Sequence, residues 1–212
     1  WRKLVRERDN FQCQSCGLHY PAMDGKFFFI PGEDKTWQSN SSVKRQKKNW
    51  TLWRRSNFIF FKERLAVHGA DDSLLDLGVG DSQFRELTEP FKEYAGVDFR
   101  PYEDVTVVCN INSGVPFRDG SFSIVMASNV LEHLPDTEKT LGEIFRVLKP
   151  GGALYATIPF MLQVHQKPYD FHRYTNFMLE RLLSHAGFTD IKVASINTPF
   201  DLYKTTQRHF FQ

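Results

Sequence analysis

The feature that most constrains this chain is a short apolar run that ends in an acid and two alternating glycines, at Ser73 to Gly80. A second apolar run, Gly96-Val97-Asp98, ends in another acid. Parallel strands that end in this way offer a nucleoside a loop without side chains and then a carboxylate for the ribose hydroxyls. Glycine suits the loop because a Cβ would occupy the ligand's volume. The pattern predicts a parallel α/β sheet that binds a nucleoside-bearing cofactor.

The spacing of the glycines distinguishes two classes of adenine cofactor. A dinucleotide fingerprint is Gly-x-Gly-x-x-Gly, and its third glycine lets a helix pack tightly below the pyrophosphate. Counted from Gly78 and Gly80, that third position holds Gln83, a long polar side chain. Gln83 therefore argues against NAD and FAD.

Five sequence blocks between Ser73 and Phe188 resemble those of a known family. In chain order they are Leu75-Asp76-Leu77-Gly78-Val79-Gly80, Gly96-Val97-Asp98, Val115 to Phe122, Val130-Leu131-Glu132-His133-Leu134 and Leu148-Lys149-Pro150-Gly151-Gly152. In this order and at this spacing they resemble the class I S-adenosylmethionine-dependent methyltransferases, close to the type 11 group. The resemblance implies an α/β fold with a doubly wound, mostly parallel, Rossmann-like sheet. It also implies S-adenosyl-L-methionine as the cofactor.

The chain departs from the family pattern at three positions. Ser82 stands where the family often has a third glycine, and Ser123 replaces an acid. Asn110 stands where the family usually has an aspartate that accepts a hydrogen bond from the adenine amino group. Because an amide oxygen also accepts hydrogen bonds, we expect the contact at Asn110 to be kept without its charge.

Hydrophobic periodicity predicts alternating strands and helices beyond residue 69. We expect strands near 73–77, 94–98, 104–108, 122–128, 153–158 and 190–195, and helices near 82–90, 137–148 and 176–186. Before them, a helix at 49–68 is predicted from an apolar stripe of Trp50, Trp53, Phe58, Phe61 and Leu65. No candidate for the family's seventh, antiparallel strand is found in 198–212.

The chain divides into three predicted parts. Residues 1–43 form a small ribbon-like hairpin segment with a linker, 44–68 form a basic amphipathic helix, and 69–212 form the cofactor-binding methyltransferase domain. Residues 1–68 hold 14 Lys/Arg against 6 Asp/Glu, whereas the remainder holds 13 against 19. Such a basic segment can hold RNA or an anionic lipid surface, although a solvated face is the favoured interpretation. The tryptophan-bearing helix can also pack against a second copy, giving a homodimer.

The N-terminal segment contains Cys13-Gln14-Ser15-Cys16-Gly17 followed by Tyr20-Pro21 and Asp24-Gly25. It resembles, in degenerate form, the zinc-ribbon-like proteins that activate tRNA methyltransferases. A closed zinc site needs four ligands, and only Cys13, Cys16 and His19 lie close together in the sequence. We therefore favour two ordinary thiols and predict no metal site.

Composition limits the remaining possibilities. A chain of 212 residues with 41% hydrophobic residues can bury one full α/β core and a small appendage. No apolar run approaches the roughly 18 residues of a membrane span. Only Cys13 and Cys16 of the three cysteines are close together, so no disulfide framework is expected and a reducing cytoplasm is favoured.

In an open α/β sheet, ligands bind beyond the carboxyl ends of the strands. By resemblance to the family, Asp76 and the backbone of Gly78, Val79 and Gly80 hold the methionine moiety, and Asp98 accepts hydrogen bonds from the ribose. The other residues expected at the cofactor are Phe99 and Ile111 on the adenine faces, Asn110 at the adenine edge, and Asn129 at a strand end.

Catalytic candidates lie on two loops that follow strands. His133 follows the fourth predicted strand, and His165, Asp170 and His172 lie between residues 160 and 175. A histidine suits removal of the acceptor's proton, and we predict His133 and His172 as the general base or acceptor contacts. The run Pro168 to Thr175 resembles a DxxRYT sequence of methyltransferases in bacterial surface-polysaccharide clusters.

These observations favour a methyltransferase that acts on an oxygen or nitrogen of a small-molecule or glycan-like acceptor. The basic N-terminal part leaves an RNA methyltransferase as one alternative. The chain lacks the Asp-Pro-Pro-Tyr-like or Asn-Pro-Pro-Tyr-like motif used on exocyclic base nitrogens, which weighs against nucleic-acid bases. A non-catalytic cofactor-binding scaffold is the other alternative.

Overall fold

The computed structural model describes residues 4–7, 10–14, 19–23, 25–29, 50–81 and 83–198. Within these ranges nine strands form one sheet in the order β1-β2-β3-β4-β7-β6-β5-β8-β9. Its parallel centre comprises β5 (Ser73–Leu77), β6 (Glu93–Asp98), β7 (Val107–Cys109), β8 (Phe122–Ser128) and β9 (Leu148–Thr157). The predicted mostly parallel α/β sheet is confirmed.

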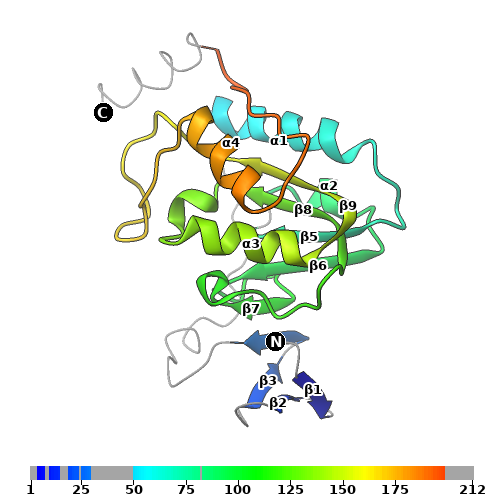
Figure 1. The fold of residues 1–212 in the computed structure, drawn as a ribbon. Coiled ribbons are helices and arrows are strands. Elements are labelled where there is room, and N and C mark those ends of the chain that lie inside the picture. The colour runs from blue at the N-terminus through cyan, green and yellow to red at the C-terminus, as the bar shows by residue number, and fades with distance from the viewer. Residues whose placement is uncertain are drawn as a thin grey trace.

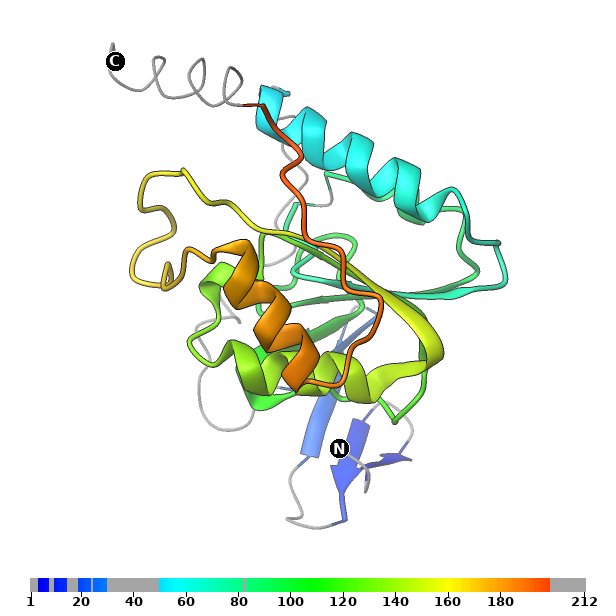
Figure 2. The ribbon, with the colours of Figure 1, turned by 45° about the horizontal axis from the view of Figure 1, so that its top comes forward.

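Helices cover both faces of the sheet (Figure 1). They are α1 (Leu52–Leu65), α2 (Arg85–Thr88), α3 (Thr137–Val147) and α4 (Asn176–His185), with single 3-10 turns η2 (Ile111–Ser113) and η3 (Leu131–His133). Figure 2 shows α1 on one side of the sheet and α3 and α4 on the other. The chain is therefore doubly wound.

Alternation along the central strand explains the two layers. Leu75 on β5 belongs to the apolar cluster that contains Leu141 of α3 and Leu182 of α4. Its neighbour Leu74 belongs to a second cluster with Phe61 of α1. Successive side chains of a strand point to opposite faces, so a continuous apolar run is buried on both sides, as parallel sheets require.

Side chains cap the starts of three helices. Thr51 Oγ1 accepts a hydrogen bond from the backbone N–H of Arg54, and Asp136 caps α3 in the same way. Thr175 Oγ1 accepts from the N–H of Met178 at 3.3 Å, and Gly187 follows α4 with φ +101°. The predicted helix at 176–186 is confirmed, with the expected cap and a glycine that adopts the left-handed conformation after it.

The N-terminal strands extend the sheet at its β7 edge. β1 (Leu4–Glu7), β2 (Asn10–Cys13), β3 (His19–Met23) and β4 (Lys26–Phe29) are joined by antiparallel pairing. β4 then pairs in parallel with β7, with Phe28 opposite Val108. Lys26 Nζ donates to the carbonyls of Glu103 and Val105, at 2.8 Å each. The expected hairpin appendage is thus part of the sheet, while the predicted boundaries of the three parts stay a prediction.

One predicted strand is wrong, and several boundaries move. The strand expected at 190–195 is absent, and among the described residues β9 is the last strand of the sheet on that side. The helix expected at 82–90 shortens to α2, since Pro90 disfavours helix in the residue before it. β7 begins later than predicted, and β9 begins earlier because Leu148 already pairs with Phe122. The predicted absence of a seventh strand concerns 198–212, of which the structure describes only Thr198.

The apolar stripe of α1 differs from the prediction at its start. Phe61 and Leu65 are buried as expected, but Trp50 is half exposed and lies before the helix. Asn57 is the third buried residue of α1. Among the described residues no helix is both long and apolar enough to cross a membrane.

Candidate functional site

The loop after β5 has the backbone that the glycine pattern predicted. Gly78 and Gly80 have φ values of +72° and +55°, a region that side chains disfavour. A Cβ at Gly78 would lie 2.4 Å from Val130 Cγ2, whereas a Cβ at Gly80 would meet no atom of the described residues closer than 3.9 Å. The N–H groups of Gly78 and Val79 donate to the carbonyl of Val97, at 2.8 and 3.2 Å. The loop is therefore fixed to β6 and leaves open space beside Gly80.

Asp98, at the end of β6, contacts this loop directly. Its Oδ2 accepts from the N–H of Gly80 at 2.9 Å, and its Oδ1 accepts from the N–H of Arg100 at 3.0 Å. Burial raises the pKa of Asp98 to about 6, although the backbone N–H donors counteract this. Each carboxylate oxygen has further capacity to accept a hydrogen bond.

Asp76 places a second buried carboxyl group beside the first. Burial raises its pKa to about 7, the Tyr94 hydroxyl lowers it by donating at 3.4 Å, and the charge of Asp98 raises it again. Two neighbouring acids at the carboxyl edge of the sheet thus share a weakly compensated negative field. Such a field suits a ligand that carries positive charge.

The raised pKa values make the stability of the free protein pH-dependent. An acid whose pKa is higher when folded binds its proton more readily in the folded state, so it favours folding below about pH 4 and ceases to do so as pH rises through the folded pKa. We expect the urea unfolding free energy to fall between about pH 4 and pH 7, by up to about 1.4 kcal/mol per pH unit and per group. Asp76→Asn should reduce this slope. Equal slopes for Asp76→Asn and the unaltered protein would contradict the shifted pKa.

The remaining residues expected at the cofactor end neighbouring strands. Phe99 is 53% exposed, and the Arg100 guanidinium lies over its ring at 5.2 Å. Asn110 caps η2 by accepting from the N–H of Asn112 at 3.1 Å, and Ile111 is buried. Asn129 follows β8 with φ +56°, and its buried Oδ1 has no hydrogen-bond partner among the described residues. A hydrogen bond joins the glycine loop to Asp98, and Asp76 interacts with Asp98 electrostatically, while these four residues stand at the same edge of the sheet.

The catalytic candidates divide into two places. His133 lies with His165, and their ring centroids are 4.8 Å apart. His172 instead lies beside Tyr174, at 5.1 Å between ring centroids, and its Nε2 is buried without a hydrogen-bond partner among the described residues. Burial lowers the pKa of His133. Of the two predicted catalytic residues, His133 is thus in ring contact with His165, and His172 is in ring contact with Tyr174.

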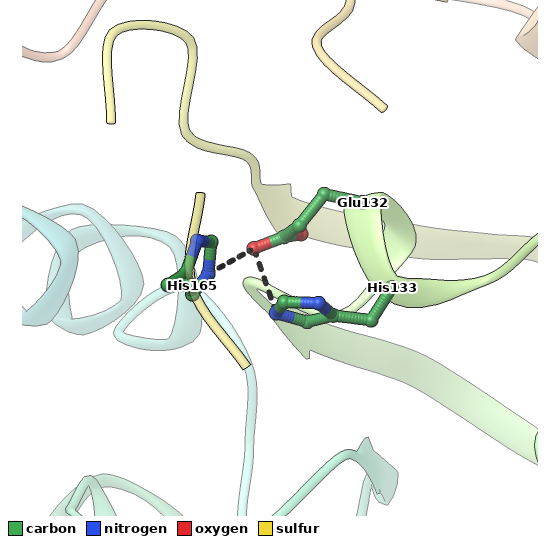
Figure 3. A group of neighbouring side chains, drawn as sticks. All are labelled: Glu132, His133 and His165. Carbon is green, nitrogen blue, oxygen red and sulfur yellow. Dashed lines mark ion pairs between the residues drawn. The ribbon is translucent and has the colours of Figure 1, made fainter. Parts of the chain in front are cut away.

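Glu132 is a residue of this site that the sequence reasoning missed (Figure 3). It is fully buried in η3, and its Oε1 lies 3.5 Å from His133 Nε2 and 3.9 Å from His165 Nε2. Burial raises the pKa of Glu132 to about 8. The sequence signal was an acid inside the apolar run Val130 to Leu134, at a position where a solvated acid is not expected.

The loop after β9 is held by the run that resembles DxxRYT. Arg173 donates to both oxygens of Asp170, at 2.7 and 2.9 Å, and also to the carbonyl of Leu162. The Arg173 guanidinium keeps the pKa of the Asp170 carboxyl well below its usual range. The N–H groups of Phe171 and His172 donate to the carbonyl of Glu132. Asp170 and Arg173 therefore fix the loop that carries two of the candidate histidines against η3.

The thiols of the N-terminal segment lie outside what the structure describes. Of this pair, Cys16 and the side chain of Cys13 are not among the described atoms. Cys109 is a buried free thiol at the end of β7. The sequence-based preference for two ordinary thiols at Cys13 and Cys16 stays a prediction.

Comparison with known proteins associates the site with one enzyme class. Residues 75–156 match the family described as a methyltransferase domain. Over 92 residues the chain is 30% identical to phosphoethanolamine N-methyltransferase 2 of Caenorhabditis elegans, which corresponds to 43% of this chain and 18% of that protein. The chain spans 36% of a similar uncharacterized methyltransferase of Mycobacterium, so it covers well under half the length of these curated relatives.

Solved structures show which fold the chain shares. Phosphoethanolamine N-methyltransferase 2 of Haemonchus contortus, in complex with S-adenosyl-L-methionine, superposes with a TM-score of 0.56 at 23% identity, covering 73% of this chain and 42% of that chain. The [4+2]-cyclase SpnF superposes with a TM-score of 0.51 at 19% identity, covering 72% and 66%. Because one fold hosts both a methyltransferase and a cyclase, the fold alone does not fix the reaction.

Proposed function

We propose that this chain, which has the fold of the class I methyltransferases, is an S-adenosylmethionine-dependent methyltransferase. The observation that carries the proposal is the glycine loop after β5, joined to a buried Asp98 carboxylate by the N–H of Gly80 at 2.9 Å. A strand end of this kind suits a ribose-bearing ligand. The match of residues 75–156 to a methyltransferase domain supports the same class.

The residues present fit this cofactor in four respects. The space beside Gly80 is open to a ligand, and Asp98 retains the capacity to accept from both ribose hydroxyls. The neighbouring Asp76 and Asp98 provide a negative field for a positively charged group. Asn129 Oδ1 is a buried acceptor in need of a donor. Phe99, Asn110 and Ile111 are proposed to enclose the adenine.

The chain's own residues then have to orient the acceptor and remove its proton. S-adenosylmethionine supplies a methyl group already activated on a sulfonium sulfur. The acceptor's oxygen or nitrogen must be held in line with the methyl carbon, and water must be excluded. His133 and His172 are proposed to contact the acceptor or take its proton. His133 suits this because burial lowers its pKa, which keeps the ring neutral near pH 7.

A small-molecule or glycan-like acceptor is the proposed substrate class. The loop between β9 and α4 exposes several large apolar side chains near the candidate histidines: Phe160, Met161, Val164, Tyr169 and Phe171. Aromatic surface of this kind can pack on an apolar or sugar-like ligand. The braced ion pair of Asp170 and Arg173 holds this loop in place.

RNA is the second candidate acceptor, favoured by the basic side chains of α1. Arg54, Arg55, Lys62 and Arg64 lie on this helix. Binding through phosphate contacts would weaken steeply with salt. RNA affinity that is independent of salt, or absent at low salt, would indicate that these side chains only form a solvated surface.

Isothermal titration with S-adenosylhomocysteine, NAD and FAD tests the proposed cofactor. We expect one site for S-adenosylhomocysteine and no heat from either dinucleotide, because Gln83 stands where a dinucleotide site needs glycine. Transfer of a labelled methyl group to pooled small metabolites, glycans and RNA then identifies the acceptor class. Binding of NAD in place of S-adenosylhomocysteine would contradict the proposal.

A further inference from the structure

Glu132, His133 and His165 form a compact group of three ligating side chains after β8 and β9 (Figure 3). Their ligating atoms all lie within 4.8 Å of one another. Glu132 is fully buried, and no other described residue donates a hydrogen bond to either of its carboxylate oxygens. A buried carboxylate without a donor is costly unless a proton or a cation compensates it.

In their neutral forms, the two histidines direct lone pairs toward this carboxylate, because each ring donates its N–H on the other side. His133 Nδ1 lies 2.5 Å from the carbonyl of Tyr169, which can only accept, so the proton is on Nδ1 and the lone pair on Nε2. His165 Nδ1 lies 3.2 Å from Asp170 Oδ2 and 3.3 Å from the carbonyl of Gln163, which fixes the same tautomer. Three potential ligand atoms therefore face one another, and no other described side chain donates a hydrogen bond into the group.

The hydrogen bonds at Nδ1 of His133 and His165 are those that metal-binding histidines usually make with their second ring nitrogen. Such histidines almost always donate the second ring N–H to a carboxylate or a backbone carbonyl, which orients the other nitrogen toward the ion. Tyr169 provides the carbonyl for His133, and Asp170 provides the carboxylate for His165. Arg173 lies nearby, but its guanidinium is bound to Asp170.

We propose that Glu132, His133 and His165 bind one divalent transition-metal ion of the zinc class. Tetrahedral bonds of about 2.0–2.1 Å separate ligand atoms by about 3.4 Å. The observed separations of 3.5 and 3.9 Å from Glu132 Oε1 exceed this value slightly. The third pair of ligating atoms lies within 4.8 Å, so the two histidines would also have to approach each other around the ion. Two imidazoles and one carboxylate suit zinc, iron or manganese better than magnesium or calcium.

Three protein ligands leave at least one coordination position for an outside group, as in catalytic rather than structural sites. The side chains of His133 and His165 are 14% and 26% exposed, so an ion can reach the group. A cation on His133 Nε2 would occupy its lone pair, which leaves His172 as the histidine predicted to take an acceptor's proton. This metal site does not depend on the proposed methyl transfer.

Titration of the full chain with Zn²⁺, and with Co²⁺ as a spectroscopic probe, tests this site. Cys13→Ser and Cys16→Ser are introduced throughout, so that thiols contribute nothing. We expect one ion per chain, and a loss of affinity of more than about a hundredfold in Glu132→Gln and in His165→Ala. Asp170→Asn, which removes an outer partner, should weaken binding by about 10- to 100-fold. His185→Ala is the control, because His185 is 73% exposed and pairs with Glu138 elsewhere.

The controls separate the possible failures. If Glu132→Gln does not fold, His165→Ala on the partly exposed loop decides the outcome. No uptake at micromolar Zn²⁺, or uptake unchanged in both ligand variants, would overturn the site. If Glu132 and the two histidines only share a proton, the chain should take up no Zn²⁺ at micromolar concentration. Titration of the same proteins with S-adenosylhomocysteine reports separately on the proposed cofactor.

Discussion

Replacement of Asp98 by alanine is expected to weaken the binding of S-adenosylhomocysteine by more than about tenfold. Hydrogen bonds to a charged group contribute about 1.5–3 kcal/mol each, and about 1.4 kcal/mol corresponds to a factor of ten. Asp98 is proposed to accept two such bonds from the ribose. Calorimetry of the purified variant measures the effect, and an unchanged affinity would refute the role of Asp98.

Two further variants control this result. Alanine leaves the N–H groups of Gly80 and Arg100 without their acceptor, so the variant can lose stability as well as affinity. Asp98→Asn keeps an amide oxygen and removes the charge, and it should fold while still binding weakly. Asp71→Ala removes an exposed acid paired with Lys92 and should bind as the unaltered protein does.

Gly78→Ala is expected to lower both stability and cofactor affinity, because two costs combine at this position. A side chain at φ +72° costs roughly 1–2 kcal/mol. The added Cβ would also lie 2.4 Å from Val130 Cγ2, and overpacking costs about 1–3 kcal/mol. We expect a loss of about 2–5 kcal/mol of unfolding free energy and more than about tenfold in S-adenosylhomocysteine affinity.

Gly120→Ala separates backbone strain from the close contact. Gly120 has a similar φ of +63°, but a Cβ there would meet no atom within 4 Å in the part of the chain that the structure describes. Its variant should lose only the smaller strain energy and keep full affinity. Val130→Ala combined with Gly78→Ala should recover part of the loss by removing the contacting methyl groups. If Gly78→Ala and Gly120→Ala lose the same unfolding free energy in urea, contact with Val130 is not the reason that residue 78 must be glycine.

The central strands could be predicted because the apolar runs that mark them lie within each strand's own sequence. β5 occupies the predicted residues, since a continuous apolar run bounded by polar residues is buried on both faces. The glycine loop was also predictable from local sequence, because glycine is the residue that most readily adopts the positive φ values found there. The strand expected at 190–195 depended on a distant pairing edge, which periodicity within one segment does not reveal.

The candidate site was predictable only in part. Asp76 and Asp98 could be proposed from the sequence because each acid stands at the end of an apolar run. The grouping of His133 with His165 depends on how the loop after β9 folds back on η3, held by Asp170 and Arg173. Neighbours brought together across more than thirty residues by a loop leave no spacing pattern. Glu132 was missed because the sequence analysis assigned a catalytic role only to its neighbour His133.

The most direct measurement of the central claim is a crystal structure of the chain with S-adenosylhomocysteine. We predict density beside the loop at Gly78 to Gly80, with both ribose hydroxyls within hydrogen-bonding distance of the Asp98 carboxylate and the adenine between Phe99 and Ile111. Density at any other place, or a ribose that does not contact Asp98, would contradict it.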